Sequence, residues 1–417
     1  MLPNMKTRFL LSFLVVGVAS LRAADAPDPI APVLQSLVDK QLVAGVTALV
    51  VDKDHTLAFD AAGYESLKTK DPMRKDSLFW IASMTKTFTA SALMMLVDEG
   101  KVSVADPVEK YLPEFKGQMI AGDDKTSAHP PRRSITITDI LTHTSGLVLA
   151  SEKTLKKEHN LAADVTHIAE APLRQEPGTK FEYNNCGIDT AGRIIEVVSG
   201  TPYADFVQHR LLDPLGMKDT TFWPTEEQAS RLAHTAKRAE DNSLEEIAHD
   251  QGVTPALIEK LGHGVKVPTP MIADMGIGVV TDYASHYAMP AGGLYSTASD
   301  LGAYCQMLLN RGEYHGRRLL SEAAVKEMSA IHTGNVPVSP QEAWGLGWTV
   351  KIGNEEGQSV GSFGHRGARR TAMWIDPKNG LAMVILVERF DMGGEEQKEM
   401  YGSFMKSAIQ AYAKAAH

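Results

Sequence analysis

Strand-like patterns occupy both ends of this 417-residue chain and helical patterns its middle, and this order constrains the fold more than any other feature. Residues 45–65 form two apolar runs around a polar Asp-Lys-Asp-His turn, which predicts a pair of strands. From residue 344, four β-rich runs are separated by Gly, Pro or Asn-Gly, with a hairpin turn at 376–380. Because short turns join antiparallel strands, we expect one antiparallel sheet built from both ends of the chain.

The predicted architecture is an α/β (α+β) fold in which N- and C-terminal helices flank an antiparallel sheet and a mostly helical domain is inserted. Apolar residues at helical spacing predict the first helix near 30–38, and an amphipathic pattern predicts the last one after residue 395. A single unit would span the mature chain. We divide this unit, 27–417, into an α/β part at 27–105 and 301–417 and a helical part at 106–300.

The first 26 residues have the features of an export signal. Lys6 and Arg8 precede an apolar run at 9–19, and Ala24-Asp25-Ala26 fits the cleavage pattern of small residues. We therefore expect an exported protein, periplasmic or secreted from a bacterium, whose mature chain begins near Pro27; a retained N-terminal anchor is the alternative. No later stretch approaches 18 uncharged apolar residues, so we expect no stable membrane span after cleavage.

Charge and residue spacing disfavour several classes of partner and cofactor. The formal net charge of −9 disfavours nucleic acid, because binding to phosphates requires a basic face. The sequence contains no Cys-x-x-Cys and no His-Glu-x-x-His, so we expect neither a metal nor another cofactor. Cys186 and Cys305 lie in apolar, helix-like contexts, and the sequence leaves open whether they are buried thiols or a disulfide. The oligomeric state is also left open.

Ser83 and Lys86 form a Ser-x-x-Lys pattern at the start of a helical run that ends at Gly100. The pattern is weak by itself, and a second copy, Ser403 to Lys406, reads as a surface pair on the last helix. Ser83 differs because a helix start leaves backbone N–H groups unpaired, and these can hold an oxyanion beside the hydroxyl. The two interpretations of Ser83 and Lys86 are a nucleophile with its base and a chance pair on a helix surface.

Tyr183 and Asn185 form the sequence's only Tyr-x-Asn and precede a helical run. Both side chains can therefore project from a helix-entry loop into one cleft. The phenol of Tyr183 is a candidate base toward Ser83 and a candidate acid toward a leaving group. The amide of Asn185 offers a donor and an acceptor to a substrate. The alternative is a loop tyrosine followed by an asparagine that caps the helix.

His365, Arg366 and Gly367 lie on a predicted strand, where glycine allows another group to approach the backbone closely. The competing His-x-Gly at 332–334 lies in a Pro-containing loop without β alternation, so we favour the first. Arg366 could hold a substrate carboxylate bidentately or lie as a solvated charge on a strand edge.

Two further arginines follow, at 369 and 370, and the same alternatives apply to them. Strand alternation places 366 and 370 on one face and 369 on the other, so the three cannot act together.

The three motifs, in this order and spacing, resemble the serine β-lactamase-like superfamily, which includes class C β-lactamases, D-alanyl-D-alanine carboxypeptidases, D-aminopeptidases and family VIII esterases. The resemblance covers essentially the whole mature chain. Further segments that look like marks of the group are found at 141–147, 291–301 and 344–348.

This resemblance implies that Ser83 is acylated and that Lys86 and Tyr183 share the proton transfers while Asn185 orients the substrate. It places the oxyanion between the backbone N–H groups of Ser83 and Ala368. His143 falls in a family signature, and we interpret it as structural. The division of the base role between Lys86 and Tyr183 stays open.

The third motif departs from the family pattern. β-Lactamases of this type usually carry Lys-Thr-Gly there, and no such tripeptide occurs in this chain. His365 stands in place of the fixed cation and Arg366 in place of a hydroxyl, a change that resembles some peptidases and esterases of the group.

The sequence therefore predicts an exported serine hydrolase that forms an acyl-serine on a small-molecule ester, amide or peptide substrate, such as an ester or a D-amino-acid-type amide. Class C β-lactamase activity and a non-catalytic cell-wall or peptide binding protein of the same fold are the alternatives.

Overall fold

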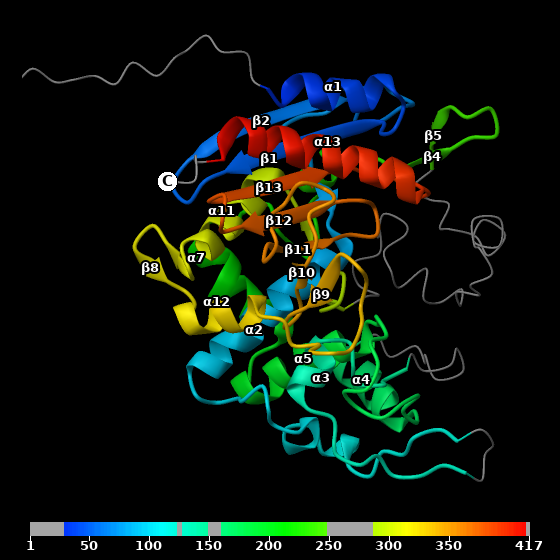
Figure 1. Cartoon of the computed structure of the whole chain (residues 1–417), viewed down its shortest axis with the longest axis vertical. Helices are drawn as coiled ribbons and strands as arrows, with labels where there is room; N and C mark the ends of the chain where they lie inside the picture. The colour runs from blue at the N-terminus through cyan, green and yellow to red at the C-terminus, as the bar shows by residue number, and fades with distance from the viewer. Residues whose placement is uncertain (1–28, 123–126, 149–159, 248–286, 414–417) are drawn as a thin grey trace, which may run out of the picture.

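The computed structural model describes residues 29–122, 127–148, 160–247 and 287–413. The predicted export signal at 1–26 lies outside these residues. The centre of the fold is a seven-stranded sheet in the order β2-β1-β13-β12-β11-β10-β9, with every neighbouring pair antiparallel (Figure 1). The strands are β1 Gly45–Val51, β2 Thr56–Gly63, β9 Glu342–Trp344, β10 Thr349–Lys351, β11 Phe363–Arg366, β12 Ala372–Asp376 and β13 Leu381–Leu386.

The two ends of the chain meet within this sheet, where β1 pairs with β13 and Leu49 faces Val384. The expected hairpin turn joins β12 to β13, and its Gly380 has the positive φ of 65° that such turns require. Both strands are buried along their whole length. The antiparallel sheet predicted from both ends of the chain is therefore confirmed.

Alternate residues of the central strands enter two separate cores, as the period of two in a strand dictates. On β1, Val46, Ala48 and Val50 pack in the core beneath α1 (Ala31–Asp39) and α13 (Gly394–Tyr412). Leu49 and Val51 of the same strand pack in the larger core on the other face. Figure 1 shows α1 and α13 crossing the sheet together, with the remaining helices on its other side. The predicted terminal helices thus cover one face of the sheet.

Helix α2 (Thr85–Asp98) lies in the interior of the larger core. Its residues from Thr85 to Leu96 are all buried, and α5 (Cys186–Ser199) and α12 (Glu322–Ser329) pack against it. A 3₁₀ turn, η1 (Ala82–Met84), leads into α2 from the short strand β3 (Phe79–Trp80). A surface pair at Ser83 and Lys86 is therefore ruled out, because this helix exposes no face in its first three turns.

The remaining helices lie mostly between β3 and the C-terminal strands. Cys186 on α5 and Cys305 on α11 are both buried and free, so they form no disulfide. Within the described residues, no helix has the length and apolar character needed to cross a lipid bilayer. These elements are η2 Val108–Lys110, η3 Pro113–Phe115, α3 Ile137–Leu141, α4 Leu161–Glu170, α6 Tyr203–Val207, the π-turn η4 Gln208–Leu212, α7 Asp213–Leu215, α8 Glu226–Ala229 and α11 Ala298–Leu309.

Segments that we assigned to the helical part also contact the sheet part. Leu232 bridges to Leu78, and Ala236 bridges to Arg389. These contacts place part of the middle of the chain beside the start of η1. The short strands involved are β4 Ala236–Arg238 paired with β5 Leu244–Glu246, and β6 Tyr295–Ser296 paired with β3; a separate pair is β7 Glu313–Tyr314 with β8 Arg317–Arg318.

Candidate active site

Ser83 lies in the 3₁₀ turn that opens the buried helix α2. The residue before it, Ala82, has φ of +45°, a left-handed conformation that is uncommon for a residue with a side chain. Such backbone strain is concentrated at functional sites, where the surrounding packing maintains it. Here Ile81 and Ala82 are both buried, so the packing holds the turn that presents Ser83.

Lys86 is completely buried and its ammonium group makes three hydrogen bonds. Nζ donates to Ser83 Oγ at 3.1 Å, to Asn185 Oδ1 at 2.8 Å and to the carbonyl oxygen of Ala291 at 2.7 Å. An ammonium has three N–H donors, so all of them are used. The lysine thus joins the start of α2, the start of α5 and the segment before β6 at a single point.

Asn185 is the residue before α5, yet its side chain does not cap that helix. Its amide oxygen accepts from Lys86 instead. The capping alternative considered for Asn185 is therefore wrong, and the side chain belongs to the cluster around Ser83.

Tyr183 lies beside the same lysine, with Lys86 Nζ 5.0 Å from the centre of the phenol ring. Its ring is 4.4 Å from the ring of His143 and 5.7 Å from that of Trp344, both buried. Tyr183 itself is 43% exposed. The structure thus brings an alcohol, an ammonium and a phenol together at a place that solvent reaches on the tyrosine side.

Asp189 is a buried member of this cluster that sequence reasoning missed. Its Oδ1 accepts a hydrogen bond from the backbone N–H of Ala291 at 3.0 Å. The carbonyl oxygen of the same residue accepts from Lys86. Burial raises the pKa of Asp189 to about 7, and the nearby Lys86 opposes this increase. Its position four residues after Asn185 on one helix face is the signal that could have identified it.

The strand β11 brings the third motif against the start of η1. A Cβ placed on Gly367 would lie 2.6 Å from the carbonyl oxygen of Ile81, so only glycine allows this approach. Within the described residues, the backbone N–H groups of Ser83 and Ala368 make no hydrogen bond. Two unpaired N–H groups on adjoining segments are the donors that an oxyanion needs.

His365 is a buried, neutral side chain rather than a substitute cation. Burial and the nearby charge of Lys86 lower the pKa of His365 to about 3. Nδ1 lies 2.7 Å from the carbonyl oxygen of Arg366, so Nδ1 carries the proton and donates it. Nε2 is then an acceptor, and it has no partner among the described residues.

The substrate-binding role considered for Arg366 is contradicted by its contacts. Its guanidinium donates to Glu342 at 2.8 Å and to both oxygens of Glu356, at 2.8 and 2.7 Å. The same group lies over the ring of Trp374, 5.2 Å from its centre. Glu342 and Glu356 also bind Lys351, so two carboxylates balance two cations here, and we interpret Arg366 as part of this ion-pair network rather than as a receptor for a substrate carboxylate or a freely solvated charge.

The expected alternation of the three arginines is also wrong, because β11 ends at Arg366 and the chain then turns. Arg370 has φ of +73°, and its guanidinium lies within 3.2 Å of the carbonyl oxygen of Met392. Arg369 lies elsewhere, over the rings of Trp80 and Phe390. A two-residue period does not apply beyond the last paired residue of a strand.

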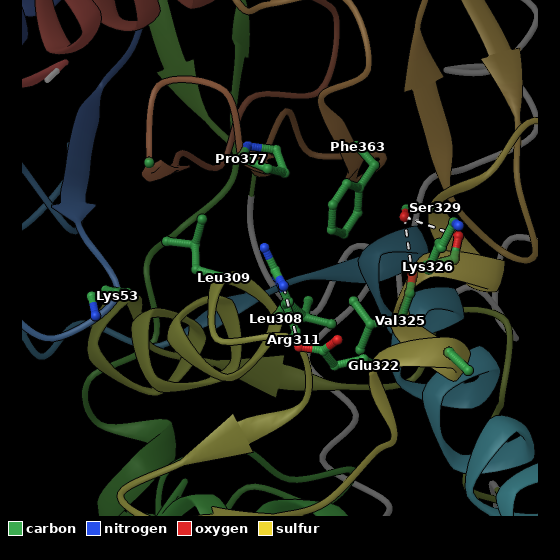
Figure 2. A pocket seen from close by; sticks show the side chains of 12 residues that line it. Lys53, Leu308, Leu309, Arg311, Glu322, Val325, Lys326, Ser329, Phe363 and Pro377 are labelled. Carbon is green, nitrogen blue, oxygen red and sulfur yellow. Dashed lines mark hydrogen bonds and ion pairs between the residues drawn. The ribbon is translucent and has the colours of Figure 1, made fainter. Parts of the chain in front are cut away.

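The other residues weighed from the sequence lie outside this cluster. Ser403 is on α13, and His332 follows α12. Among the described residues, no group of three His, Cys, Asp or Glu side chains is arranged to hold a metal ion. Figure 2 shows a separate pocket of about 760 Å³ between α11, α12 and the β12–β13 turn, lined by residues such as Leu308, Val325 and Phe363.

This fold is shared with solved structures: a penicillin-binding protein homologue from Pyrococcus abyssi superposes with a TM-score of 0.64 at 21% identity, covering 89% of this chain and 75% of that one. The beta-lactamase family model matches residues 30–401, so this chain belongs to that family, which is one of serine hydrolases. The resemblance seen in the sequence is confirmed.

Relatives and solved structures extend this result. A putative D-alanyl-D-alanine carboxypeptidase of Salmonella enteritidis is 28% identical over 383 residues, covering 85% of this chain and 82% of that protein. EstCE1, a hydrolase with promiscuous acyltransferase activity, superposes with a TM-score of 0.73 at 21% identity, covering 90% of this chain and 97% of that one. A mutant simvastatin synthase of Aspergillus terreus superposes with a TM-score of 0.72 at 20% identity, covering 93% and 96%. At these identities the two solved structures show a shared fold.

Proposed function

We propose that this protein is an exported serine hydrolase that forms an acyl-enzyme on Ser83 and acts on an ester or a D-amino-acid-type amide. The observation that carries the proposal is the enclosed ammonium of Lys86, which bonds to Ser83 Oγ and Asn185 Oδ1 beside the partly exposed Tyr183. A buried cation without a counter-ion in hydrogen-bond contact is costly to fold, and such groups are retained where chemistry needs them.

The proposed reaction follows from the directions of these hydrogen bonds. Because Lys86 donates to Ser83 Oγ, the hydroxyl proton of Ser83 is free to leave toward another acceptor. Tyr183 takes this proton as Oγ attacks the carbonyl carbon, and it returns the proton to the leaving oxygen or nitrogen. The N–H groups of Ser83 and Ala368 hold the oxyanion, and water then releases the acyl group.

Two observations support esters and D-amino-acid amides over β-lactams. The third motif supplies the neutral His365 and an Arg366 held by Glu342 and Glu356, so the motif itself presents no unpaired cation. A Salmonella relative is named a putative D-alanyl-D-alanine carboxypeptidase, which favours an amide of this type. The export signal predicted at 1–26 supports action outside the cytoplasm.

The first experiment is labelling with a fluorophosphonate followed by mass spectrometry of tryptic peptides. The adduct is expected on the peptide that contains Ser83, and Ser83→Ala is expected to abolish it. Ser403→Ala is the matched control, because it removes the serine of the other Ser-x-x-Lys pair on α13 and should leave labelling unchanged. Absence of any adduct on the folded protein would favour a binding protein instead.

The second experiment is a rate panel of p-nitrophenyl acetate, p-nitrophenyl butyrate, nitrocefin and a D-Ala-D-Ala peptide. We expect the esters or the peptide to be turned over with the highest kcat/KM. Fastest turnover of nitrocefin would show that the argument from His365 is wrong.

A further inference from the structure

Arg369 is the residue after Ala368, whose backbone N–H is a proposed oxyanion donor, and it packs on Trp80, three residues before the proposed nucleophile Ser83. Its guanidinium is 5.6 Å from the ring centre of Trp80 and 4.8 Å from that of Phe390. The indole N–H of Trp80 donates to the carbonyl oxygen of Gly292 at 2.7 Å. Trp80 therefore contacts both Arg369 and Gly292. Gly292 follows Ala291, whose carbonyl oxygen accepts from Lys86.

The guanidinium of Arg369 is enclosed but makes no hydrogen bond to any residue in the described part of the chain. The residue is only 4% exposed. Arg366, Arg370 and Arg389 each have one side-chain nitrogen that is fully buried and unpaired. No nitrogen of Arg369 is fully buried and unpaired, so the small exposed area of this residue includes its guanidinium nitrogens. A guanidinium has five N–H donors, and leaving them unpaired in a protein interior is costly.

The nearest carboxyl group does not satisfy this cation. Glu388 Oε2 lies 3.9 Å from Arg369 Nε, beyond hydrogen-bond distance. Glu388 already accepts from the backbone N–H of Trp80 at 3.2 Å and from Thr235 Oγ1 at 3.1 Å. Burial lowers the pKa of Arg369 and raises the pKa of Glu388, as expected for two groups that compensate each other incompletely. The site thus has spare donors for a further anion.

The position of Tyr183 indicates which part of the substrate would carry an anion bound at Arg369. The leaving group must lie beside Tyr183, which returns the proton to it, and the rings of Trp344 and His365 lie on the same side. The acyl part is bonded to the other side of the reacting carbonyl carbon, whose oxyanion is assigned to the N–H of Ala368, the residue before Arg369. Arg366 cannot take over this role, because Glu342 and Glu356 hold it.

We propose that Arg369 determines specificity by binding a carboxylate on the acyl part of the substrate, so that the preferred substrates are esters or amides of an acidic acyl donor. This inference rests on the acyl-Ser83 mechanism proposed above. The planar guanidinium can bind a carboxylate through two parallel hydrogen bonds, with the faces of Trp80 and Phe390 fixing its orientation.

The test uses pairs of substrates that differ only in charge: the mono-p-nitrophenyl esters of adipic, pimelic and suberic acid, and the methyl ester of each. We expect the wild type to prefer the free acid of at least one pair by about tenfold or more in kcat/KM. Arg369→Gln should lower kcat/KM for that acid by about 10- to 100-fold and leave the methyl ester close to its wild-type rate. Arg370→Gln is the matched control and should keep the preference.

The inference is overturned if the wild type hydrolyses the methyl esters as fast as the acids, a result that needs no variant. It is equally overturned if Arg369→Gln slows both members of a pair alike, since that is the effect of a purely structural arginine. Fluorophosphonate labelling of the same preparations separates the two proposals. A labelled Ser83 without charge preference refutes only the role of Arg369, whereas an unlabelled Ser83 refutes both.

Discussion

Replacement of Lys86 by methionine tests whether this buried lysine is present for chemistry or for stability. Lys86 is completely enclosed, and its three hydrogen bonds connect α2, α5 and the segment before β6. A methionine of similar length fills most of the space and removes the charge and the donors. The two roles predict different effects of Lys86→Met on the free energy of unfolding.

The expected magnitude follows from opposing contributions of similar size. Burial of an ammonium costs several kcal/mol, and each hydrogen bond from a charged donor contributes about 1.5–3 kcal/mol. In Lys86→Met the oxygens of Asn185 and Ala291 lose a donor, at about 1–3 kcal/mol each, while the cost of burying the charge disappears. We therefore expect the free energy of unfolding to change by less than about 2 kcal/mol. Ester hydrolysis, in contrast, should fall by about a thousandfold or more.

The assay is urea unfolding followed by fluorescence, together with kcat/KM for p-nitrophenyl butyrate on the same samples. Near-native stability with lost hydrolysis would assign Lys86 to the reaction. A loss of more than about 4 kcal/mol, the range seen when a buried charge network is broken, would show that Lys86 chiefly holds the helices together. Retained hydrolysis would refute the proposed proton path outright.

Two further predictions concern groups whose roles the structure revised or revealed. Arg366→Met should lower the free energy of unfolding by about 2–4 kcal/mol, because Glu342 and Glu356 lose one of their two cationic partners and keep only Lys351, while kcat/KM of the folded protein stays near wild type; a specific loss of activity without destabilisation would restore the substrate-binding role. Burial raises the pKa of Asp189 from an ordinary value of 3.8 to about 7, so the folded protein binds the proton of this carboxyl group more tightly than the unfolded protein does. The free energy of unfolding of the wild type should therefore decrease as pH rises from about 4 to about 7. Asp189→Asn should remove this decrease, being more stable than the wild type by up to about 4 kcal/mol at pH 8 and no more stable at pH 4, as measured by denaturant unfolding at both pH values; an identical pH dependence of the two proteins would contradict the assignment.

Local patterns in the sequence were sufficient to predict the sheet and the first members of the site. The apolar run of β1 and the turn at 376–380 depend on neighbouring residues, and both are found as expected. Ser83, Lys86, Tyr183 and Asn185 could be identified because each stands in a short motif whose residue types suit acyl transfer. Their roles in the reaction remain part of the proposed function.

Which of the three neighbouring arginines keeps unpaired donors, in contrast, was decided only by the tertiary structure. Arg366, Arg369 and Arg370 are almost adjacent in sequence, yet the first is neutralised by Glu342 and Glu356, the second has spare donors and the third contacts backbone carbonyls. The carboxylates that neutralise Arg366 come from β9 and from the loop after β10, and the sequence does not indicate which arginine they will reach. Periodicity and turn chemistry act over a few residues and can be read from the chain, whereas the charge that a side chain presents depends on which distant groups folding places beside it.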